Sequence, residues 1–210
     1  MIRVFIADDH ALIREGIKNL ISLESDISVI GETSNPFEIL DFLKKNKCDI
    51  LILDISMPGK SGLDVLKELK SSEIPTKVLM ITMLPEGQFA RRTLKSGASG
   101  YLTKDSASSE IITAIRRIAS GRKYISQSLA EILASDIDDT IEKEAHEILS
   151  DREFQILGLI ANGISQTEIA DKLTLSISTV NTYRSRILEK LCLRTNADLI
   201  HYAFKNKLIE

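Results

Sequence analysis

The sequence is poor in cysteine: only Cys48 and Cys192 occur among 210 residues. They are far apart in the chain and fall in different predicted domains, which argues against a disulfide framework like that of small secreted proteins. We expect both to be packing residues in a protein that resides in a reducing compartment.

Long apolar runs are also missing. The apolar opening of the chain leads within a few residues into the polar Asp8, Asp9 and His10. No segment approaches the roughly 20 apolar residues that cross a bilayer. We therefore expect a cytoplasmic protein with no membrane partner.

An overall excess of positive charge is absent, since the formal net charge is -3. Residues 1–120 carry 16 basic and 16 acidic side chains, residues 121–147 carry 3 and 7, and residues 148–210 carry 8 and 7. The acidic excess therefore lies in the middle, and the length leaves room for two domains. We expect domains at 1–120 and 148–210, joined by a linker at 121–147.

Strand-like and helical patterns alternate in the first 120 residues. The apolar strand-like runs are 3–7, 27–31, 49–54, 77–82 and 100–103, and apolar residues at helical spacing lie between them. Right-handed crossovers between parallel strands place helices on both faces of a sheet. This pattern predicts an α/β fold with a doubly wound, five-stranded parallel sheet.

Polar side chains follow four of these strands at the edge where ligands bind in open α/β sheets. Each has an ordinary explanation alone, because acids often cap helices and lysines are usually solvated. Together they favour a functional site. They are Asp8 and Asp9 after the first strand, Asp54 after the third, Thr82 after the fourth and Lys104 after the fifth.

Three crowded carboxylates repel one another, and a divalent cation relieves that repulsion. The donors are all oxygen atoms, which favours Mg²⁺ over zinc or copper. A carboxylate beside Mg²⁺ can attack a phosphoryl group and form an aspartyl phosphate. Lys104 and Thr82 would neutralise and hydrogen-bond the phosphoryl oxygens, so the edge is interpreted as a phosphoryl-acceptor site.

These residues, with Met57-Pro58-Gly59 and the segment 97–104, resemble a bacterial response-regulator receiver domain. The resemblance implies that Asp54 is the phosphoacceptor. It also implies Mg²⁺ ligation by Asp8 or Asp9, by Asp54 and by the main-chain carbonyl of Ser56. Thr82 and Tyr101 would form the switch pair.

The region after residue 120 predicts a short amphipathic helix between Tyr124 and Ala134. Its acidic part is usually a solvated tether, but it could also rest on a basic surface of the second domain and restrain it. These acids are Asp136, Asp138, Asp139, Glu142, Glu144 and Glu147.

The last 60 or so residues predict a helix-turn-helix. Ser150 and Glu153 form a capping box that opens one helix. A second helix begins near Ser165, and a third runs over 177–191 after a short turn. At about 100° per residue, the third helix has a buried stripe through Val180 and a polar outward face.

That outward face has the character of a surface that enters the major groove of DNA. Asn and hydroxyl side chains can read base edges in the major groove, while basic side chains meet phosphates. The alternative is a solvated helix face, but the position of this helix after another helix and a short turn favours the DNA-binding interpretation. The DNA-contacting candidates are Ser178, Thr179, Asn181, Thr182, Arg184, Ser185, Arg186, Lys190 and Arg194.

This domain resembles a LuxR-type DNA-binding domain through Asp151-Arg152-Glu153, Glu168-Ile169-Ala170 and Ser178-Thr179-Val180, among other segments. With the receiver, it is identified as a member of the NarL/FixJ family. Asn181 and Tyr183 depart from the family's usual lysine and histidine. The resemblance implies a DNA-bound dimer through the fourth helix, at Leu199, Ile200 and Ala203.

Three functions remain open. The first is a DNA-binding transcription factor that a sensor histidine kinase phosphorylates at Asp54, after which it forms a homodimer on double-stranded DNA. The second is a metal-dependent aspartyl phosphatase, which would typically need an acid where Ser56 stands. The third is a constitutive DNA-binding protein whose receiver serves only in dimerisation.

Overall fold

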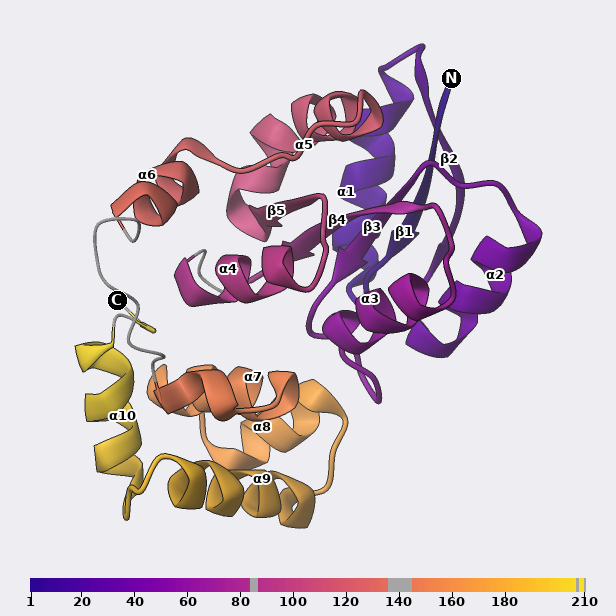
Figure 1. The fold of residues 1–210 in the computed structure, drawn as a ribbon. Coiled ribbons are helices and arrows are strands. Elements are labelled where there is room, and N and C mark those ends of the chain that lie inside the picture. The colour runs from indigo at the N-terminus through magenta and orange to yellow at the C-terminus, as the bar shows by residue number, and fades with distance from the viewer. Residues whose placement is uncertain (84–86, 136–144, 207, 210) are drawn as a thin grey trace. The chain divides into compact units, whose positions relative to one another are not determined.

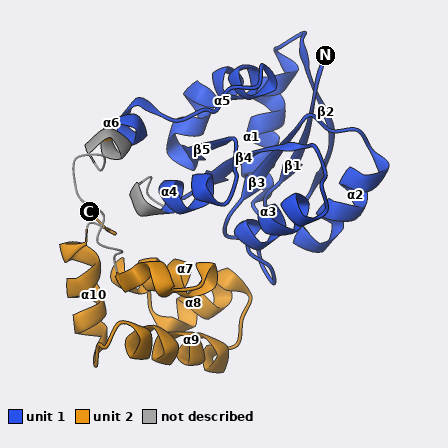
Figure 2. Cartoon of the chain, in the orientation of Figure 1, with its two compact units in different colours: residues 1–130 blue, residues 131–210 orange. Residues whose placement is uncertain are grey.

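The chain forms two compact units, residues 1–130 and 131–210, and each is described by itself (Figures 1 and 2). The computed structural model describes residues 1–83, 87–135, 145–206 and 208–209. No helix within these described ranges combines the length and the apolar character that crossing a membrane requires.

The first unit is built on a parallel sheet in the order β2-β1-β3-β4-β5. The direction of strand addition reverses between β1 and β3, and this is where doubly wound sheets leave a crevice at the carboxyl ends of their strands. The predicted fold class is confirmed. The strands are β1 (Ile2–Ala7), β2 (Ile27–Thr33), β3 (Ile50–Asp54), β4 (Lys77–Thr82) and β5 (Gly100–Thr103).

Helices cover both faces of this sheet (Figure 1). Successive strand residues point to opposite faces, so Ile6 and Ile52 pack in one core with Ile111 of α5. On the other face, the ring centroids of Phe5 and Phe42 lie 4.1 Å apart. The first face is covered by α1 (Ala11–Ser22) and α5 (Lys104–Ala119), and the second by η1 (Pro36–Glu38), α2 (Ile39–Lys45), α3 (Gly62–Ser71) and α4 (Gly87–Lys95).

The chain after α5 returns along the outer edge of β5. Tyr124 forms a parallel bridge with Gly100, and its N–H donates to the Ser99 carbonyl at 2.9 Å. A Cβ on Gly100 would lie 3.0 Å from the Tyr124 carbonyl, so glycine permits this approach. The next helix, α6 (Gln127–Ser135), buries Leu129 completely.

This helix agrees with the one predicted between Tyr124 and Ala134. It also means that the first unit extends to Ala130, past residue 120 where we predicted the domain to end. Of the predicted acidic segment, only Glu147 is described, and it is exposed. The other acids, Asp136, Asp138, Asp139, Glu142 and Glu144, lie outside the described residues.

The second unit is all-helical, as predicted. Three of its helices begin with a capping box, in which the cap side chain and the third helical residue satisfy each other's main-chain N–H groups. The boxes pair Ser150 with Glu153, Ser165 with Glu168, and Thr195 with Asp198. The elements are η2 (Ala145–Ile148), α7 (Asp151–Ala161), α8 (Gln166–Leu173), α9 (Ile177–Lys190) and α10 (Asn196–Lys205).

The turn between α8 and α9 is short because Thr174 ends α8 in the left-handed conformation, with φ of 52°. Ser176 then caps α9 by accepting a hydrogen bond from the Thr179 N–H at 3.0 Å. Val180 and Ile187 of α9 are fully buried. The predicted helix-turn-helix and its buried stripe are therefore confirmed.

Candidate functional site

Two acids meet where the sheet order reverses. Asp8 directly follows β1, and Asp54 is the last residue of the neighbouring strand β3. Both side chains are buried, with exposures of 2% and 1%. The more exposed Asp9 stands beside them, and one ligand atom from each of Asp8, Asp9, His10 and Asp54 lies within 4.8 Å of the others.

Lys104 places its ammonium group at this site, as predicted. It begins α5, and its Nζ lies 2.8 Å from Asp8 Oδ2 and 2.9 Å from Asp54 Oδ2. Burial raises the pKa of Asp54, and the Asp8 charge adds to this rise while Lys104 opposes it. Burial opposes the ammonium form of Lys104, but Asp54 and Asp8 outweigh it and raise the lysine's pKa.

The loop after β3 is held against Asp54 at close range. The Ser56 N–H donates to Asp54 Oδ1 at 3.1 Å, and the Gly62 N–H donates to the Ile55 carbonyl at 3.0 Å. A Cβ on Gly62 would lie only 2.1 Å from the Asp54 carbonyl oxygen. The start of α3 therefore needs glycine at this position. It also sets how the segment that carries Ser56 leaves the strand.

His10 is a member of this cluster that the sequence analysis did not select. Its Nδ1 lies 2.7 Å from Asp9 Oδ1 and 3.4 Å from Lys104 Nζ. The only signal was its place directly after Asp8 and Asp9. Arg14 was also missed, and its Nη1 donates to the Asp8 carbonyl at 2.7 Å, which fixes the start of α1.

Thr82 and Tyr101 lie on one face of the sheet. Tyr101 pairs in register with Met80, and Thr82 pairs with Thr103. Because side chains alternate along strands, Thr82 and Tyr101 both point to the face that α4 covers. Both are fully buried.

The acidic cluster fits a divalent cation that prefers oxygen ligands. Its three carboxylates face one ammonium group, so negative charge remains in excess. Asp9 Oδ1 is buried and accepts no hydrogen bond from the described residues, although His10 Nδ1 lies 2.7 Å from it. Such an oxygen atom is available to a hard cation.

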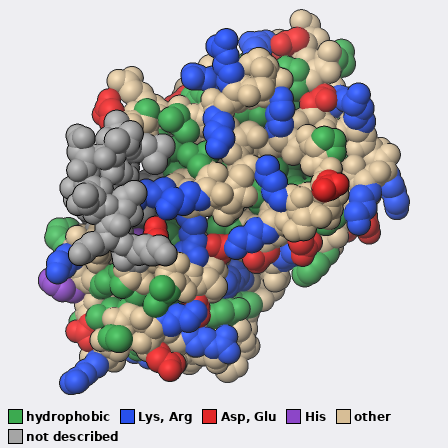
Figure 3. Space-filling model, viewed as in Figure 1, with side chains coloured by type: hydrophobic (Ala, Val, Ile, Leu, Met, Phe, Trp, Pro, Cys, Tyr) green, Lys and Arg blue, Asp and Glu red, His purple; other side chains and the backbone are tan. Residues whose placement is uncertain are grey.

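The second candidate site is the outward face of α9. The side chains of Ser178, Asn181, Thr182, Ser185 and Arg186 are exposed, and Thr179 and Arg184 are partly so. In Figure 3, basic side chains are scattered over the visible surface of the protein and are interrupted by acidic and apolar ones. No single basic patch stands out on that surface.

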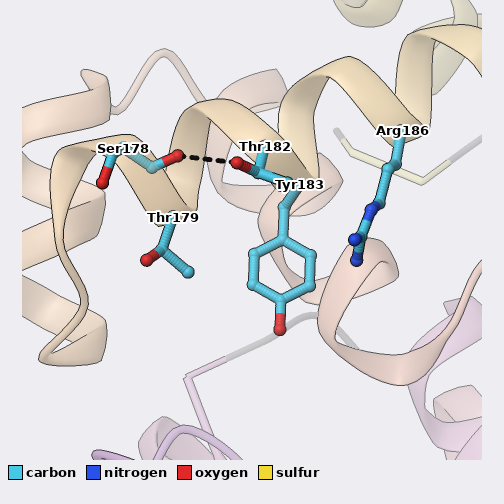
Figure 4. A pocket seen from close by; sticks show the side chains of 5 residues that line it. All are labelled: Ser178, Thr179, Thr182, Tyr183 and Arg186. Atoms are coloured by element: carbon cyan, nitrogen blue, oxygen red, sulfur yellow. Dashed lines mark hydrogen bonds between the residues drawn. The ribbon is translucent and has the colours of Figure 1, made fainter.

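The basic residues of α9 differ in what they contact. Arg184 Nε donates to Asn196 Oδ1, and Lys190 Nζ lies 2.7 Å from Glu153 Oε2. Both are thus tied to other helices of the same unit. Arg186 makes no hydrogen bond or ion pair within the described part of the chain, and it lines a hollow beside α9 (Figure 4).

One prediction for α10 needs correction. Leu199 and Ala203 are fully buried in their own unit, so their side chains have no surface to offer a second protomer. Their spacing of four residues places them on the inward stripe of the helix. Ile200 is 40% exposed and Phe204 is 66% exposed, so these two present the apolar surface of α10.

Comparison with known families decides what this combination is. A model of the response regulator receiver domain matches residues 4–116, and one of bacterial regulatory proteins of the luxR family matches residues 147–203. The chain is a two-component response regulator. Its receiver and LuxR-type DNA-binding domain place it in the NarL/FixJ family, whose members are transcription regulators rather than enzymes.

Full-length relatives of this response regulator share the arrangement. It is 35% identical over 209 residues to Response regulator UvrY of Escherichia coli strain K12, covering 99% of this chain and 96% of UvrY. It is 34% identical over 216 residues to Oxygen regulatory protein NreC of Staphylococcus epidermidis, covering 99% of both chains.

Solved structures of response regulators also match this chain over nearly its whole length. The response regulator matches RcsB of Salmonella typhimurium at 26% identity and a TM-score of 0.70, with 97% of each chain covered. It also matches RcsB of Salmonella enterica serovar Typhimurium bound to promoter P1flhDC with the phosphomimetic BeF₃⁻. That match has 27% identity and a TM-score of 0.61, and it covers 96% of this chain and 97% of RcsB.

Proposed function

We propose that Asp54 accepts a phosphoryl group from a sensor histidine kinase and that this controls binding to double-stranded DNA. The observation that carries the proposal is the excess of buried carboxylates around Asp54, with Lys104 as their only close ammonium group among the described residues. A buried acid with a raised pKa, beside a specific charge partner and at a sheet edge, is typical of functional sites.

In the proposed reaction, an Asp54 carboxylate oxygen forms a bond to phosphorus as the bond between phosphorus and the donor's imidazole nitrogen breaks. The imidazole leaves with the electron pair and takes up a proton. The Lys104 ammonium group would move from the Asp54 carboxylate to pair with a phosphoryl oxygen. The Thr82 hydroxyl would donate a hydrogen bond to another phosphoryl oxygen.

The proposed cation is Mg²⁺, held by Asp8, Asp9, Asp54 and the main-chain carbonyl of Ser56. It would supply charge neutralisation at the phosphoryl oxygens. Gly62 supports this assignment because it allows the chain beyond Ser56 to fold back tightly on β3.

Thr82 and Tyr101 are proposed as the switch pair. Movement of Thr82 towards the phosphate would leave space on the α4 side of the sheet, and Tyr101 would repack into it. The shared face of these side chains supports this coupling. A preference of a few kcal/mol for one arrangement is enough to shift the population of the output state.

The output is proposed to be a homodimer that binds paired DNA half-sites through α9. We assign the receiver to residues 1–120, the linker to 121–147 and the DNA-binding domain to 148–210, working in the cytoplasm. The RcsB relatives support DNA binding as dimers, since one of their structures holds two RcsB dimers on two parallel DNAs.

The test combines phosphorylation with DNA selection. The full chain is incubated with Mg²⁺ and acetyl phosphate, and the gain of one phosphoryl group is followed by mass spectrometry. A random DNA library is then offered to the phosphorylated and unphosphorylated forms. We expect one phosphoryl group per chain and enrichment of one sequence by the phosphorylated form. Rapid multi-turnover hydrolysis, or equal enrichment by both forms, would contradict the proposal.

A further inference from the structure

The hollow beside α9 has a volume of about 300 Å³ and is lined by Ser178, Thr179, Thr182, Tyr183 and Arg186. Figure 4 shows Tyr183 and Arg186 projecting to the same side of the helix. Ser178, Thr182 and Arg186 follow one another at intervals of four residues, so they form a line about 12 Å long along the helix. This length is close to the width of the major groove of B-DNA, about 12 Å.

The hydroxyl groups of the hollow are already engaged with the helix itself. Thr182 Oγ1 donates to the Ser178 carbonyl at 2.9 Å. Ser176 Oγ lies 2.7 Å from both Ser178 Oγ and Thr179 Oγ1. These contacts hold the hydroxyl groups along the walls of the hollow and occupy part of their hydrogen-bonding capacity.

The remaining donors are the phenol of Tyr183 and the guanidinium of Arg186. Within the part of the chain that the structure describes, neither side chain has a hydrogen bond or an ion pair. Arginine carries five N–H donors and no acceptor. The hollow is therefore complementary to a ligand group with two adjacent acceptors.

In the major groove, guanine presents two adjacent acceptors, O6 and N7, whereas adenine presents one acceptor beside a donor and cytosine presents a donor. A phosphate also offers acceptors, but phosphates flank the groove. At about 100° per residue, Arg186 lies about 60° from the middle of the outward face of α9, and Arg184 about 140° from it. Arg186 is thus better placed to enter the groove.

We propose that Arg186 reads the O6 and N7 edge of one guanine in each DNA half-site, with that edge seated in the hollow beside α9. The inference rests on the proposed DNA-binding function. It assigns base readout to Arg186, which the sequence analysis had grouped with phosphate contacts. Arg184 and Lys190 then serve as a positioning group and an internal ion-pair partner.

The test uses the phosphorylated full chain and the DNA sequence that it selects from a random library. Each guanine of the selected site is replaced in turn by 7-deazaguanine, which lacks the N7 acceptor. For one guanine per half-site, we expect the wild-type protein to lose about 10-fold or more in affinity. Arg186→Ala is expected to bind the normal and substituted duplexes equally.

Arg184→Ala is the matched control, because it removes a neighbouring arginine that contacts Asn196. It should keep the wild-type sensitivity to 7-deazaguanine. Circular dichroism and thermal melting establish that each variant is folded.

Two results would overturn the inference while leaving DNA binding intact. In the first, Arg186→Ala weakens binding equally for every duplex and lowers the slope of log affinity against log salt by about 0.9, which identifies a phosphate contact. In the second, Arg186→Ala binds like the wild type. If no sequence is selected at all, the proposed function fails and the inference fails with it.

Discussion

Both units pair a lysine with a buried carboxylate, but the two pairs differ in their charge balance. Around Glu153, one carboxylate meets Lys190 Nζ at 2.7 Å and the Ser150 N–H at 2.7 Å. Around Asp54, the carboxylates of Asp8 and Asp54 share Lys104 Nζ, and the carboxylate of Asp9 stands beside them. The first arrangement is electrostatically complete and serves stability. The second holds excess negative charge, which is useful only if another cation or a reaction partner enters.

The largest effect is expected from replacing the proposed phosphoacceptor in the Asp54 cluster. Asp54→Asn keeps the shape of the side chain but removes the nucleophilic carboxylate, so we expect complete loss of phosphorylation by acetyl phosphate. Mass spectrometry measures the outcome. Asp64→Asn, at an exposed position in the first turn of α3, should be phosphorylated like the wild type. Phosphorylation of the Asp54→Asn variant would place the acceptor elsewhere.

The close approach of Gly62 to Asp54 predicts the next largest effect. A Cβ at 2.1 Å from the Asp54 carbonyl oxygen forces the backbone apart. Gly62→Ala should therefore lower the free energy of unfolding by about 3 kcal/mol and slow phosphorylation.

Gly16→Ala is the control for this substitution. A Cβ at Gly16 meets no atom within 4 Å, and the residue lies inside α1. It should raise the free energy of unfolding by about 0.5–1 kcal/mol. Chemical denaturation measures both variants, and equal effects would show that Gly62 is not a close-contact position.

Removing Lys190 tests whether the ion pair with Glu153 stabilises the second unit. Lys190→Met leaves the buried carboxylate of Glu153 without its ion-pair partner. We expect the second unit to lose about 1–3 kcal/mol of unfolding free energy in thermal or chemical denaturation. Lys205→Met, at the exposed end of α10, should change it by less than about 0.5 kcal/mol. If Lys190→Met left the free energy of unfolding unchanged, water would fully replace the lysine as the partner of Glu153.

The smallest expected effect is an opposite response to acid. Burial opposes ionisation of Glu153, but hydrogen bonds from Lys190 and Ser150 outweigh it and lower the pKa. Its stabilising contribution is therefore present above the unfolded pKa of about 4.3 and lost as the pH falls through the folded value. Asp54 has a raised pKa, so its charge costs stability at neutral pH and acidification removes that cost.

Melting curves between neutral and acidic pH measure this difference against Glu153→Gln and Asp54→Asn. Wild type should lose its stability advantage over Glu153→Gln at low pH. Wild type should also lose its disadvantage relative to Asp54→Asn as the pH falls. The same sign for both differences would contradict the comparison.

Most of the fold could be predicted because hydrophobic periodicity depends on local sequence. The strand β3 and the helix α9 lie within one residue of their predicted ranges. The meeting of Asp8 with Asp54 also followed from topology, since both end neighbouring parallel strands.

Contacts between distant segments could not be predicted in the same way. Periodicity identified the outward face of α9, but not that Arg184 contacts Asn196 or that Lys190 contacts Glu153, 37 residues away. Leu199 and Ala203 received a dimer role by resemblance, although their spacing alone is that of a buried stripe. His10 was overlooked because a ligand role depends on where its ring points, and sequence does not specify that.

The return of the chain along β5 has a consequence for self-association. An open sheet edge can template pairing with a second chain. Here the main chain of Tyr124 occupies part of that edge, beside Gly100. A second receiver cannot add a strand at this point without displacing Tyr124, so the β5 side of the sheet is protected from pairing with another chain.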